Sequence, residues 1–286
     1  MTRISFIAIG NELLKGRIVN TNAAEAALLL RQHGYDLNRM LVVGDEASAI
    51  AEAVTAELEQ QQVVLLSGGL GPTRDDLTKK TLADLFGSRL QLHAPSLQHL
   101  KARFAQRKRM LTPRNQQQAY LPHNCEPIPN AKGTAPGMLF KKGKKMLFAM
   151  PGVPFELRYM LEHEVIPRIR QVYTPTFIEH RIVRLSHIPE SHAADRMAEI
   201  EATFDPHLSL AYLPRNDGLW LELSVKVEKG RKDQMLTALN TATARIKAHF
   251  TDYVYAEGSD PLEVLVGRFL RQKSLTLAVA ESLTGG

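Results

Sequence analysis

One stretch decides the fold of the first half of this chain: Val63-Val-Leu-Leu-Ser-Gly-Gly-Leu-Gly-Pro-Thr-Arg-Asp-Asp-Leu-Thr78. It opens with an apolar run that is typical of a strand buried on both faces, and it continues as a glycine-rich loop. Asp75 or Asp76 stands where it can cap a helix that runs through Leu82 to Phe86. A buried strand, a loop and a helix in this order predict one β-α unit of a parallel sheet.

Two similar units precede this stretch. The apolar run Ile4 to Ile9 predicts a strand, and the Ala- and Leu-rich segment from Ala23 to Gln32 predicts a helix, for which Asn22 and Glu25 have the spacing of a capping box. Met40 to Val43 predicts another strand, and the helix after it has apolar residues at every fourth position. The chain therefore begins with an α/β domain, whose mostly parallel sheet is covered by helices.

The rest of the first domain is less regular. The segment from Ala94 to Tyr120 has the composition of helix, and its basic residues between Lys101 and Arg114 indicate a solvated helix face. Met138 to Phe140 and Met146 to Met150 flank a lysine-rich tip and predict a β-hairpin. A further helix is expected from Phe155 to about Ile169.

The pattern changes after Gln171 to strand, helix, strand, strand, helix, which predicts a small α+β domain. It lacks the Gly-x-x-Gly loop by which KH modules clamp nucleic acid, so we expect a spacer or dimerisation role rather than RNA binding. A last helix through Leu262 to Arg271 and a strand at Leu275 to Ala280 follow. We expect domains at residues 1–170 and 171–258, and an incomplete α/β segment at 259–286.

Composition limits the classes of protein that fit. The chain has 286 residues, a formal charge of +6 and a single cysteine, Cys125. One cysteine excludes a disulfide framework and a cysteine-based zinc site, and it suits a reducing compartment such as the cytoplasm. No run reaches the roughly 18 apolar residues of a membrane span, so no membrane association is expected. The positive charge suits an anionic partner, but the four lysines of the hairpin tip between Lys141 and Lys145 are not interleaved with aromatic residues as in single-stranded nucleic-acid sites.

Carboxylates follow three of the predicted strands. Ligands of an open parallel sheet bind beyond the carboxyl ends of its strands. The first strand is followed by Glu12, the second by Asp45, and the third by Asp75 and Asp76. Asp45 also has the position to cap the helix after it. The sequence therefore predicts an acidic edge beside the glycine-rich loop.

The glycine loop itself predicts a phosphate site. Its glycines, Gly68, Gly69 and Gly71, let the backbone approach a ligand and present N–H groups to an anion. The following helix adds its N-terminal dipole, and donors are available from Thr73, Thr78 and Lys79. The loop matches neither the Walker motif nor the dinucleotide fingerprint, which excludes ATP hydrolysis of the P-loop type.

Carboxylates beside a phosphate repel it unless a cation intervenes. Mg²⁺ binds one or two carboxylates together with phosphate oxygens. Asp45 and Asp75 are the expected ligands of this divalent metal, while Asp76 is expected to cap the helix. A metal held in this way activates water and polarises a phosphoryl group, which is the chemistry of phosphoanhydride hydrolysis.

The motifs taken together resemble the CinA (competence/damage-inducible) family. They are Gly10-Asn-Glu-Leu-Leu, Ile18-Val-Asn-Thr-Asn22, Val43-Gly-Asp45, the loop Gly68 to Thr78, Asn115 with Gln118-Ala119, Gly133-Thr-Ala-Pro-Gly137 and Pro151-Gly-Val-Pro154. The resemblance covers the whole chain. It implies a MoaB/MogA-like molybdopterin-binding domain, a KH-like domain and the opening of a nicotinamide mononucleotide deamidase domain.

The resemblance also implies an activity, which is metal-dependent ADP-ribose pyrophosphatase in the first domain, and a homodimer. The expected catalytic residues are Asp45, Asp75 and Lys79. By motif match, the residues expected to bind the nucleotide are Asn11, Glu12, Thr21, Asn22, Gly68, Gly69, Gly71, Thr73, Asp76, Thr78 and Asn115.

Other activities are weighed beside this one. Ser282 matches the nucleophile of the deamidase module, but a hydroxyl needs a base within reach, and the residues that would supply it do not follow. We expect no deamidation by this chain. A module that binds a pterin or nucleotide phosphate without hydrolysis would use the same loop, and a molybdopterin adenylyltransferase is a further alternative. A nucleic-acid binder ranks last.

Overall fold

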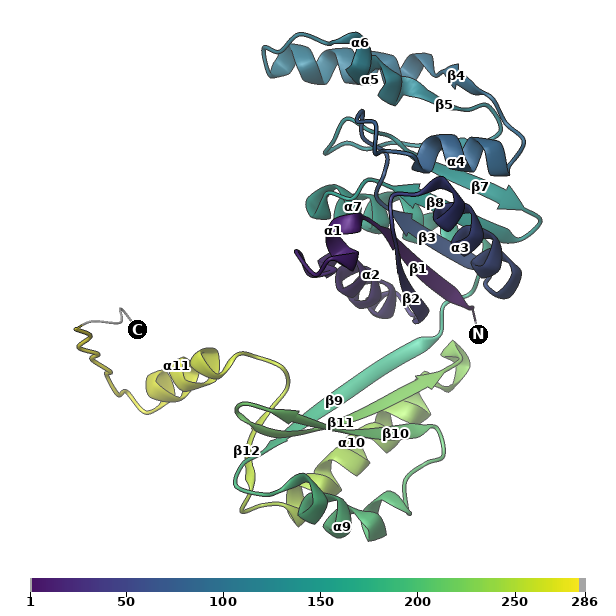
Figure 1. The fold of residues 1–286 in the computed structure, drawn as a ribbon. Coiled ribbons are helices and arrows are strands. Elements are labelled where there is room, and N and C mark those ends of the chain that lie inside the picture. The colour runs from purple at the N-terminus through teal and green to yellow at the C-terminus, as the bar shows by residue number, and fades with distance from the viewer. Residues whose placement is uncertain (1, 283–286) are drawn as a thin grey trace. The chain divides into compact units, whose positions relative to one another are not determined.

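The computed structural model describes residues 2–282 (Figure 1). The chain divides into two compact units, with the boundary between Thr176 and Phe177. Among the residues described, no helix is long and apolar enough to cross a membrane.

A six-stranded sheet forms the first unit. Its strand order is β2 (Leu37–Val43), β1 (Ile4–Ile9), β3 (Val63–Ser67), β8 (Lys145–Met150), β7 (Gly137–Lys142) and β6 (Glu126–Ile128). The first four strands are parallel to one another, and β7 pairs antiparallel with β8 on one side and with β6 on the other. The prediction of a mostly parallel sheet with an added hairpin is confirmed.

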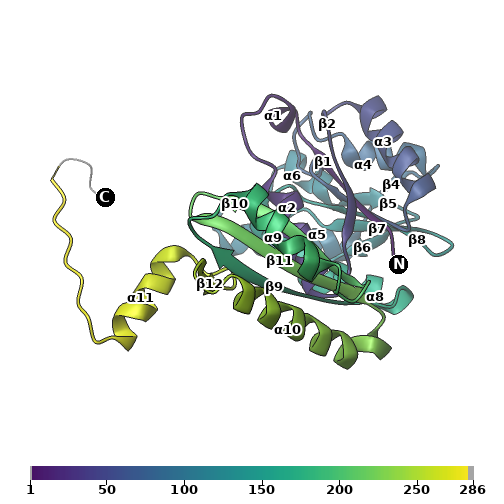
Figure 2. The ribbon, with the colours of Figure 1, turned by 90° about the horizontal axis from the view of Figure 1, so that it is seen from below.

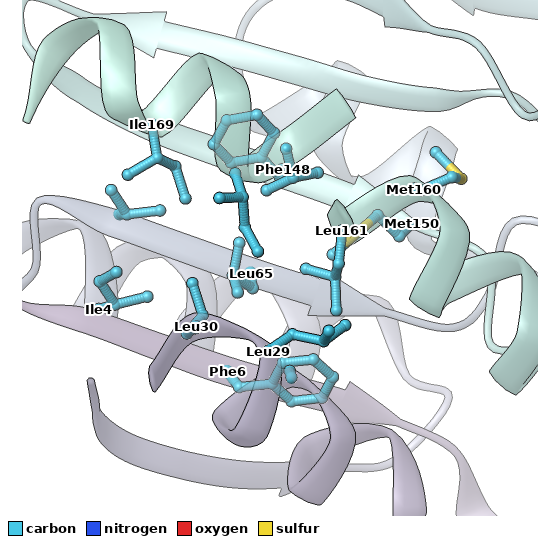
Figure 3. Close-up of a cluster of buried hydrophobic side chains, with 14 of the residues drawn as sticks. Ile4, Phe6, Leu29, Leu30, Leu65, Phe148, Met150, Met160, Leu161 and Ile169 are labelled. Atoms are coloured by element: carbon cyan, nitrogen blue, oxygen red, sulfur yellow. The ribbon is translucent and has the colours of Figure 1, made fainter. Parts of the chain in front are cut away.

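Helices cover both faces of this sheet. One face carries α2 (Thr21–Gln32) and a continuous helix made of α7 (Pro154–Met160), the π-turn η2 (Leu161–Val165) and α8 (Ile166–Val172). The other face carries α3 (Ala47–Gln60) and α4 (Thr78–Leu85). Figure 3 shows the first of these cores, where Phe6, Leu65 and Phe148 of the strands meet Leu29, Leu30 and Leu161 of the helices. Burial on both faces explains why the central strands read as unbroken apolar runs.

In chain order, a smaller lobe comes after α4 and before the strands β7 and β8 of the hairpin. It contains β4 (Leu90–Leu92) and β5 (Tyr120–Pro122), which pair as a two-stranded antiparallel sheet. Between them come α5 (Ala94–Gln106), α6 (Pro113–Gln116) and the 3₁₀ turn η1 (Gln117–Ala119). The long helical segment predicted here is therefore broken after Gln106. Strands of three residues, like β4, β5 and β6, are too short to leave a periodic signal.

The second unit is built on a four-stranded antiparallel sheet. Its order is β10 (Leu208–Arg215), β11 (Gly218–Val227), β9 (Phe177–Leu185) and β12 (Val254–Glu257). Both α9 (Glu190–Glu201) and α10 (Lys232–His249), the latter preceded by η3 (Lys229–Arg231), pack on one face of it (Figures 1 and 2). The predicted order is confirmed, with β12 as an additional strand.

The last helix of the described chain is α11 (Leu262–Gln272), and none of its residues is buried. The strand predicted at Leu275 to Ala280 is wrong, because this segment pairs with no strand of the described chain and its side chains are exposed. A strand needs a neighbour to satisfy its backbone, so an apolar pattern alone does not make one. The division of residues 259–286 from the rest as a separate segment stays a prediction.

Candidate functional site

A cleft of about 690 Å³ lies where the loops after four parallel strands meet. Ile9 and Glu12 reach it after β1, Asp45 after β2, the glycine loop after β3, and the segment Pro151 to Glu156 after β8. The remaining wall consists of Gln118, Thr134 and Ala135. The convergence predicted from the strand ends is therefore present.

Two glycines give the loop its shape. Gly68 and Gly69 have φ of 116° and 67°, a conformation that side chains rarely adopt. A Cβ on Gly68 would lie 2.5 Å from the Ile9 carbonyl oxygen, and one on Gly69 would lie 2.1 Å from Oγ1 of Thr78. Thr78 is buried and donates from its hydroxyl to the Gly68 carbonyl at 2.9 Å. Thr78 thus holds the loop and does not line the cleft.

Asp76 also holds the loop, from within. Its carboxylate accepts hydrogen bonds from the Gly71 amide at 2.9 Å, the Thr73 amide at 2.8 Å and the Thr73 hydroxyl at 2.5 Å. The prediction that Asp75 or Asp76 caps α4 is wrong, since Leu77 is the N-cap and no side chain bonds the helix end. Asp76 thereby occupies two of the amides expected to hold phosphate, and Thr73 does not line the cleft.

The amides of two successive loop residues, Gly69 and Leu70, are among those that remain available to an anion. Gly69 and Leu70 both line the cleft, and their N–H groups donate to no other residue in the described part of the chain. Successive free amides of this kind are suited to a phosphate oxygen.

The edge of the cleft is acidic, as predicted. Its lining includes five carboxylates and neither lysine nor arginine: Glu12, Asp45, Asp75, Asp76 and Glu156. Asp45 accepts a hydrogen bond from the Asn11 amide at 2.8 Å, and Asn11 is the first residue of the short helix α1 (Asn11–Leu14), whose N-cap is Gly10. The prediction that it caps α3 is wrong, because Glu46 is the N-cap there. Asp75 is exposed, and although its backbone carbonyl accepts from the Leu77 amide at 3.0 Å, its carboxylate has no hydrogen bond or ion pair with any described residue.

No group of three or more His, Cys, Asp or Glu side chains within residues 2–282 is arranged to hold a metal ion. Asp45 and Asp75 fit Mg²⁺ in a more limited way. Both residues line the same cleft, and Mg²⁺ binds one or two carboxylates and completes its shell with waters and phosphate oxygens.

A pocket of 130 Å³ adjoins the cleft and shares Ile9, Glu12, Gly152 and Pro154 with it. Thr21 and Asn22 line this pocket. The Asn22 side-chain amide donates to Oγ of Ser67 at 3.1 Å and to the Gly152 carbonyl at 2.7 Å. Its oxygen Oδ1 is buried with no partner in the described chain, so it can accept from a ligand. The capping box predicted at Asn22 is wrong, since Asn20 caps α2.

Four other predicted residues lie outside the cleft lining. The ammonium of Lys79 donates to the Gln117 carbonyl, and burial lowers its pKa to about 8 although the charge of Asp76 acts in the opposite direction. Asn115 bonds Thr112 at the start of α6. Asn11 supports the site only through its backbone amide on Asp45. Ser282 belongs to the second unit, and its side chain is exposed.

The structure adds residues that the sequence reasoning missed. Glu156 lines the cleft and accepts from the Asn130 amide at 2.7 Å, and a Cβ on Gly133 would lie 1.9 Å from its Oε2. Glu156 could have been found from the sequence, because it follows β8 and ligands of a parallel sheet bind beyond the carboxyl ends of the strands. Gln118 comes from the lobe rather than from a strand end, so its only signal was the motif Gln118-Ala119, which the sequence reasoning quoted without assigning Gln118 to the site.

The fold and this cleft define the class of the first unit, which is a MoaB/MogA-like molybdopterin-binding domain. Residues 5–171 match the family described as a probable molybdopterin binding domain, and residues 180–256 match the damage-inducible protein CinA KH domain. The chain belongs to the CinA family.

Relatives support this membership over nearly the whole chain. A CinA-like protein of Cytophaga hutchinsonii is 34% identical over 280 residues, which are 98% of this chain and 66% of the relative. One from Chloroherpeton thalassium is 36% identical over 284 residues, 98% of this chain and 67% of the relative. The chain therefore spans about two thirds of the length of these relatives. A crystal structure of a protein CinA of unknown function from Thermoplasma acidophilum is 38% identical, with a TM-score of 0.54 over 60% of this chain and 98% of that one.

Proposed function

We propose that the cleft hydrolyses the phosphoanhydride of a nucleotide of the ADP-ribose type with the help of a divalent metal, Mg²⁺ first among them. One observation carries this proposal: two free backbone amides, at Gly69 and Leu70, share a cleft with five carboxylates and no basic side chain. Such a site repels a bare diphosphate but accepts one whose charge a cation offsets.

Each part of the cleft has a role in this proposal. Asp45 and Asp75 would hold the metal, which when bound activates water and polarises a phosphoryl group. The amides of Gly69 and Leu70 would orient the diphosphate, while Asn22 and Thr21 would hold ribose hydroxyls in the adjoining pocket. Water adds to one phosphorus as the bridging P–O bond breaks, and the leaving phosphate takes the electron pair of that bond.

The test compares two carboxylates near the glycine loop. The Asp75→Asn variant removes the charge of a cleft residue, whereas Asp84→Asn alters an exposed carboxylate on α4 outside the cleft. We expect ADP-ribose turnover with Mg²⁺ to fall at least about 100-fold in Asp75→Asn, because a ligand of a catalytic metal contributes several kcal/mol. The Asp84→Asn variant should behave as the wild type. Turnover of Asp75→Asn within a few-fold of the wild type would remove the metal role from Asp75.

A second candidate function is binding of a pterin or nucleotide phosphate without hydrolysis. The family match to a molybdopterin-binding domain and the lack of a three-ligand metal group among the described residues favour it. Calorimetry separates the two functions: heat of binding with ADP-ribose and no AMP formed, across several divalent metals, supports the binding module. A screen of phosphoanhydrides with product identification would also reveal adenylyl transfer.

The other expectations for this chain remain proposals of the same kind. We infer a cytoplasmic homodimer that does not bind nucleic acid, and analytical ultracentrifugation measures its mass.

A further inference from the structure

Gln118 is a buried amide in the wall of the cleft without a role in the fold. Its side chain is only 5% exposed, and it lines the cleft beside Thr134 and Ala135. Its carbonyl oxygen Oε1 is fully buried, yet no described residue donates a hydrogen bond to it. A buried carbonyl without a donor is unfavourable, and such groups are rare in folded proteins unless a water or ligand completes them.

The backbone around Gln118 is fixed on both sides. The carbonyl of Gln117 accepts a hydrogen bond from the ammonium of Lys79, and the carbonyl of Ala119 accepts one from the His93 amide at 2.9 Å. Lys79 belongs to α4, the helix that follows the glycine loop, while His93 precedes α5 in the lobe. The side chain of Gln118 is therefore positioned but left unbonded, as expected for a group whose partner is a ligand.

A primary amide selects a particular edge of a ligand. Its oxygen accepts from an amino group while its nitrogen donates to a neighbouring ring nitrogen, the pairing by which glutamine and asparagine recognise adenine. The amino-bearing edge of a pterin offers the same donor and acceptor pair. The apolar side chains of Leu70 and Ala135, which also line the cleft, suit the faces of a flat ring.

We propose that Gln118 is a specificity-determining residue that recognises an amino group next to a ring nitrogen on a heteroaromatic ring of the ligand. This inference rests on the proposed use of the cleft for a nucleotide or pterin phosphate. Beyond the proposed function, it identifies the part of the ligand that determines specificity. The phosphate binds to the glycine loop, and Gln118 recognises the ring.

The experiment uses the whole chain and two pairs of probes. AMP is compared with purine riboside 5′-monophosphate, and pterin with 4-hydroxypteridine. Within each pair the second compound lacks only the amino group. We expect the wild type to bind the amino compound of one pair about tenfold more tightly, the value of one good hydrogen bond. Preference within the first pair identifies an adenine ligand, and preference within the second identifies a pterin.

Two variants assign the preference to this side chain. Gln118→Met keeps the size and removes the amide, so it should bind both members of the pair equally. Gln117→Met alters the neighbouring glutamine, whose side chain is exposed, and should keep the wild-type preference. Thermal unfolding separates a ligand role from a structural one: the ligand-free Gln118→Met protein should melt no lower than the wild type, because it loses only an unsatisfied group.

Three results would overturn the inference. They are no preference within either pair in the wild type, an unchanged preference in Gln118→Met, and a lower melting temperature of Gln118→Met. A second variant, Gln118→Leu, also removes the amide and provides the same comparison if the methionine variant does not fold. ADP-ribose hydrolysis is measured on the same samples: a preference without hydrolysis removes the proposed activity alone, and hydrolysis without a preference removes this inference alone.

Discussion

The neighbouring carboxylates Asp75 and Asp76 should respond to substitution in opposite ways. The Asp76 carboxylate accepts three hydrogen bonds within the glycine loop, from the Gly71 amide, the Thr73 amide and the Thr73 hydroxyl, whereas the Asp75 carboxylate accepts none from the described chain. The Asp76→Ala variant should therefore destabilise the first unit, while Asp75→Ala should affect metal-dependent turnover without changing stability.

The size of the effect follows from these contacts. Hydrogen bonds to a charged group contribute about 1.5 to 3 kcal/mol each when buried. Asp76 is partly exposed, so water can replace part of each bond, and about 1 kcal/mol per bond is the better value. The expected loss in Asp76→Ala is about 2 to 3 kcal/mol, which is about 4 to 12 °C in the melting temperature of a domain of this size.

Urea and thermal unfolding of the two alanine variants measure the difference directly. Both substitutions remove one carboxylate from the same loop, so each serves as the control for the other. Equal unfolding midpoints for Asp76→Ala and the wild type would refute the assignment of Asp76 as the residue that holds the loop. A loss of stability in Asp75→Ala as large as that in Asp76→Ala would refute it too.

Three further predictions concern single side chains. Burial raises the pKa of Cys125 from 9.0 to about 11, so its thiolate fraction near neutral pH is about 100-fold lower than in the unfolded chain. Because the thiolate is the reactive form, iodoacetamide should alkylate Cys125 about 100-fold more slowly in the native protein than in the unfolded one. Burial lowers the pKa of Lys79 from 10.5 to about 8, so between these two pH values the unfolded state binds more protons than the folded state. The free energy of unfolding should therefore rise by about 2 kcal/mol between about pH 8 and pH 10. This rise should be absent in Lys79→Met; a parallel pH profile for the two proteins would contradict it. Arg184 is fully buried, stacks on the ring of Trp220 at 4.0 Å and donates to the carbonyls of Gly258 and Asp260. The Arg184→Met variant should therefore lower the free energy of unfolding of the second unit by about 3 kcal/mol. It should also shift the fluorescence of Trp220, the sole tryptophan of the sequence. An unchanged emission spectrum would argue against the stacked arrangement.

Most of the sheet could be predicted because burial leaves a local signal. The strands β1, β3 and β8 are apolar on both faces, and each is followed by glycine or proline, so their existence and the position of the cleft at their ends follow from short stretches of sequence. The short strands β4 to β6 and β12 have no comparable pattern. Their residues are strands only because a partner lies beside them.

The helix caps were the least predictable part of the first unit. Asn22, Asp45 and Asp76 each have a side chain and a position that suit a cap, yet each bonds something else: Ser67 and Gly152, the Asn11 amide, and the glycine loop. A short polar side chain can satisfy several nearby donors, and the choice among them depends on which backbone arrives within reach.

The sequence by itself determined the α/β class, the acidic edge and the glycine loop, because these depend on residue type and local order. Only the tertiary structure decided which of these polar groups have a hydrogen-bond partner within the protein and which have none. Asp76 occupies amides that would otherwise bind an anion, while Asn22 and Gln118 keep buried oxygens without a donor. The physical reason is that a hydrogen-bond partner is chosen by distance in space, and segments as far apart in the chain as Asn22 and Gly152 come together only in the folded protein.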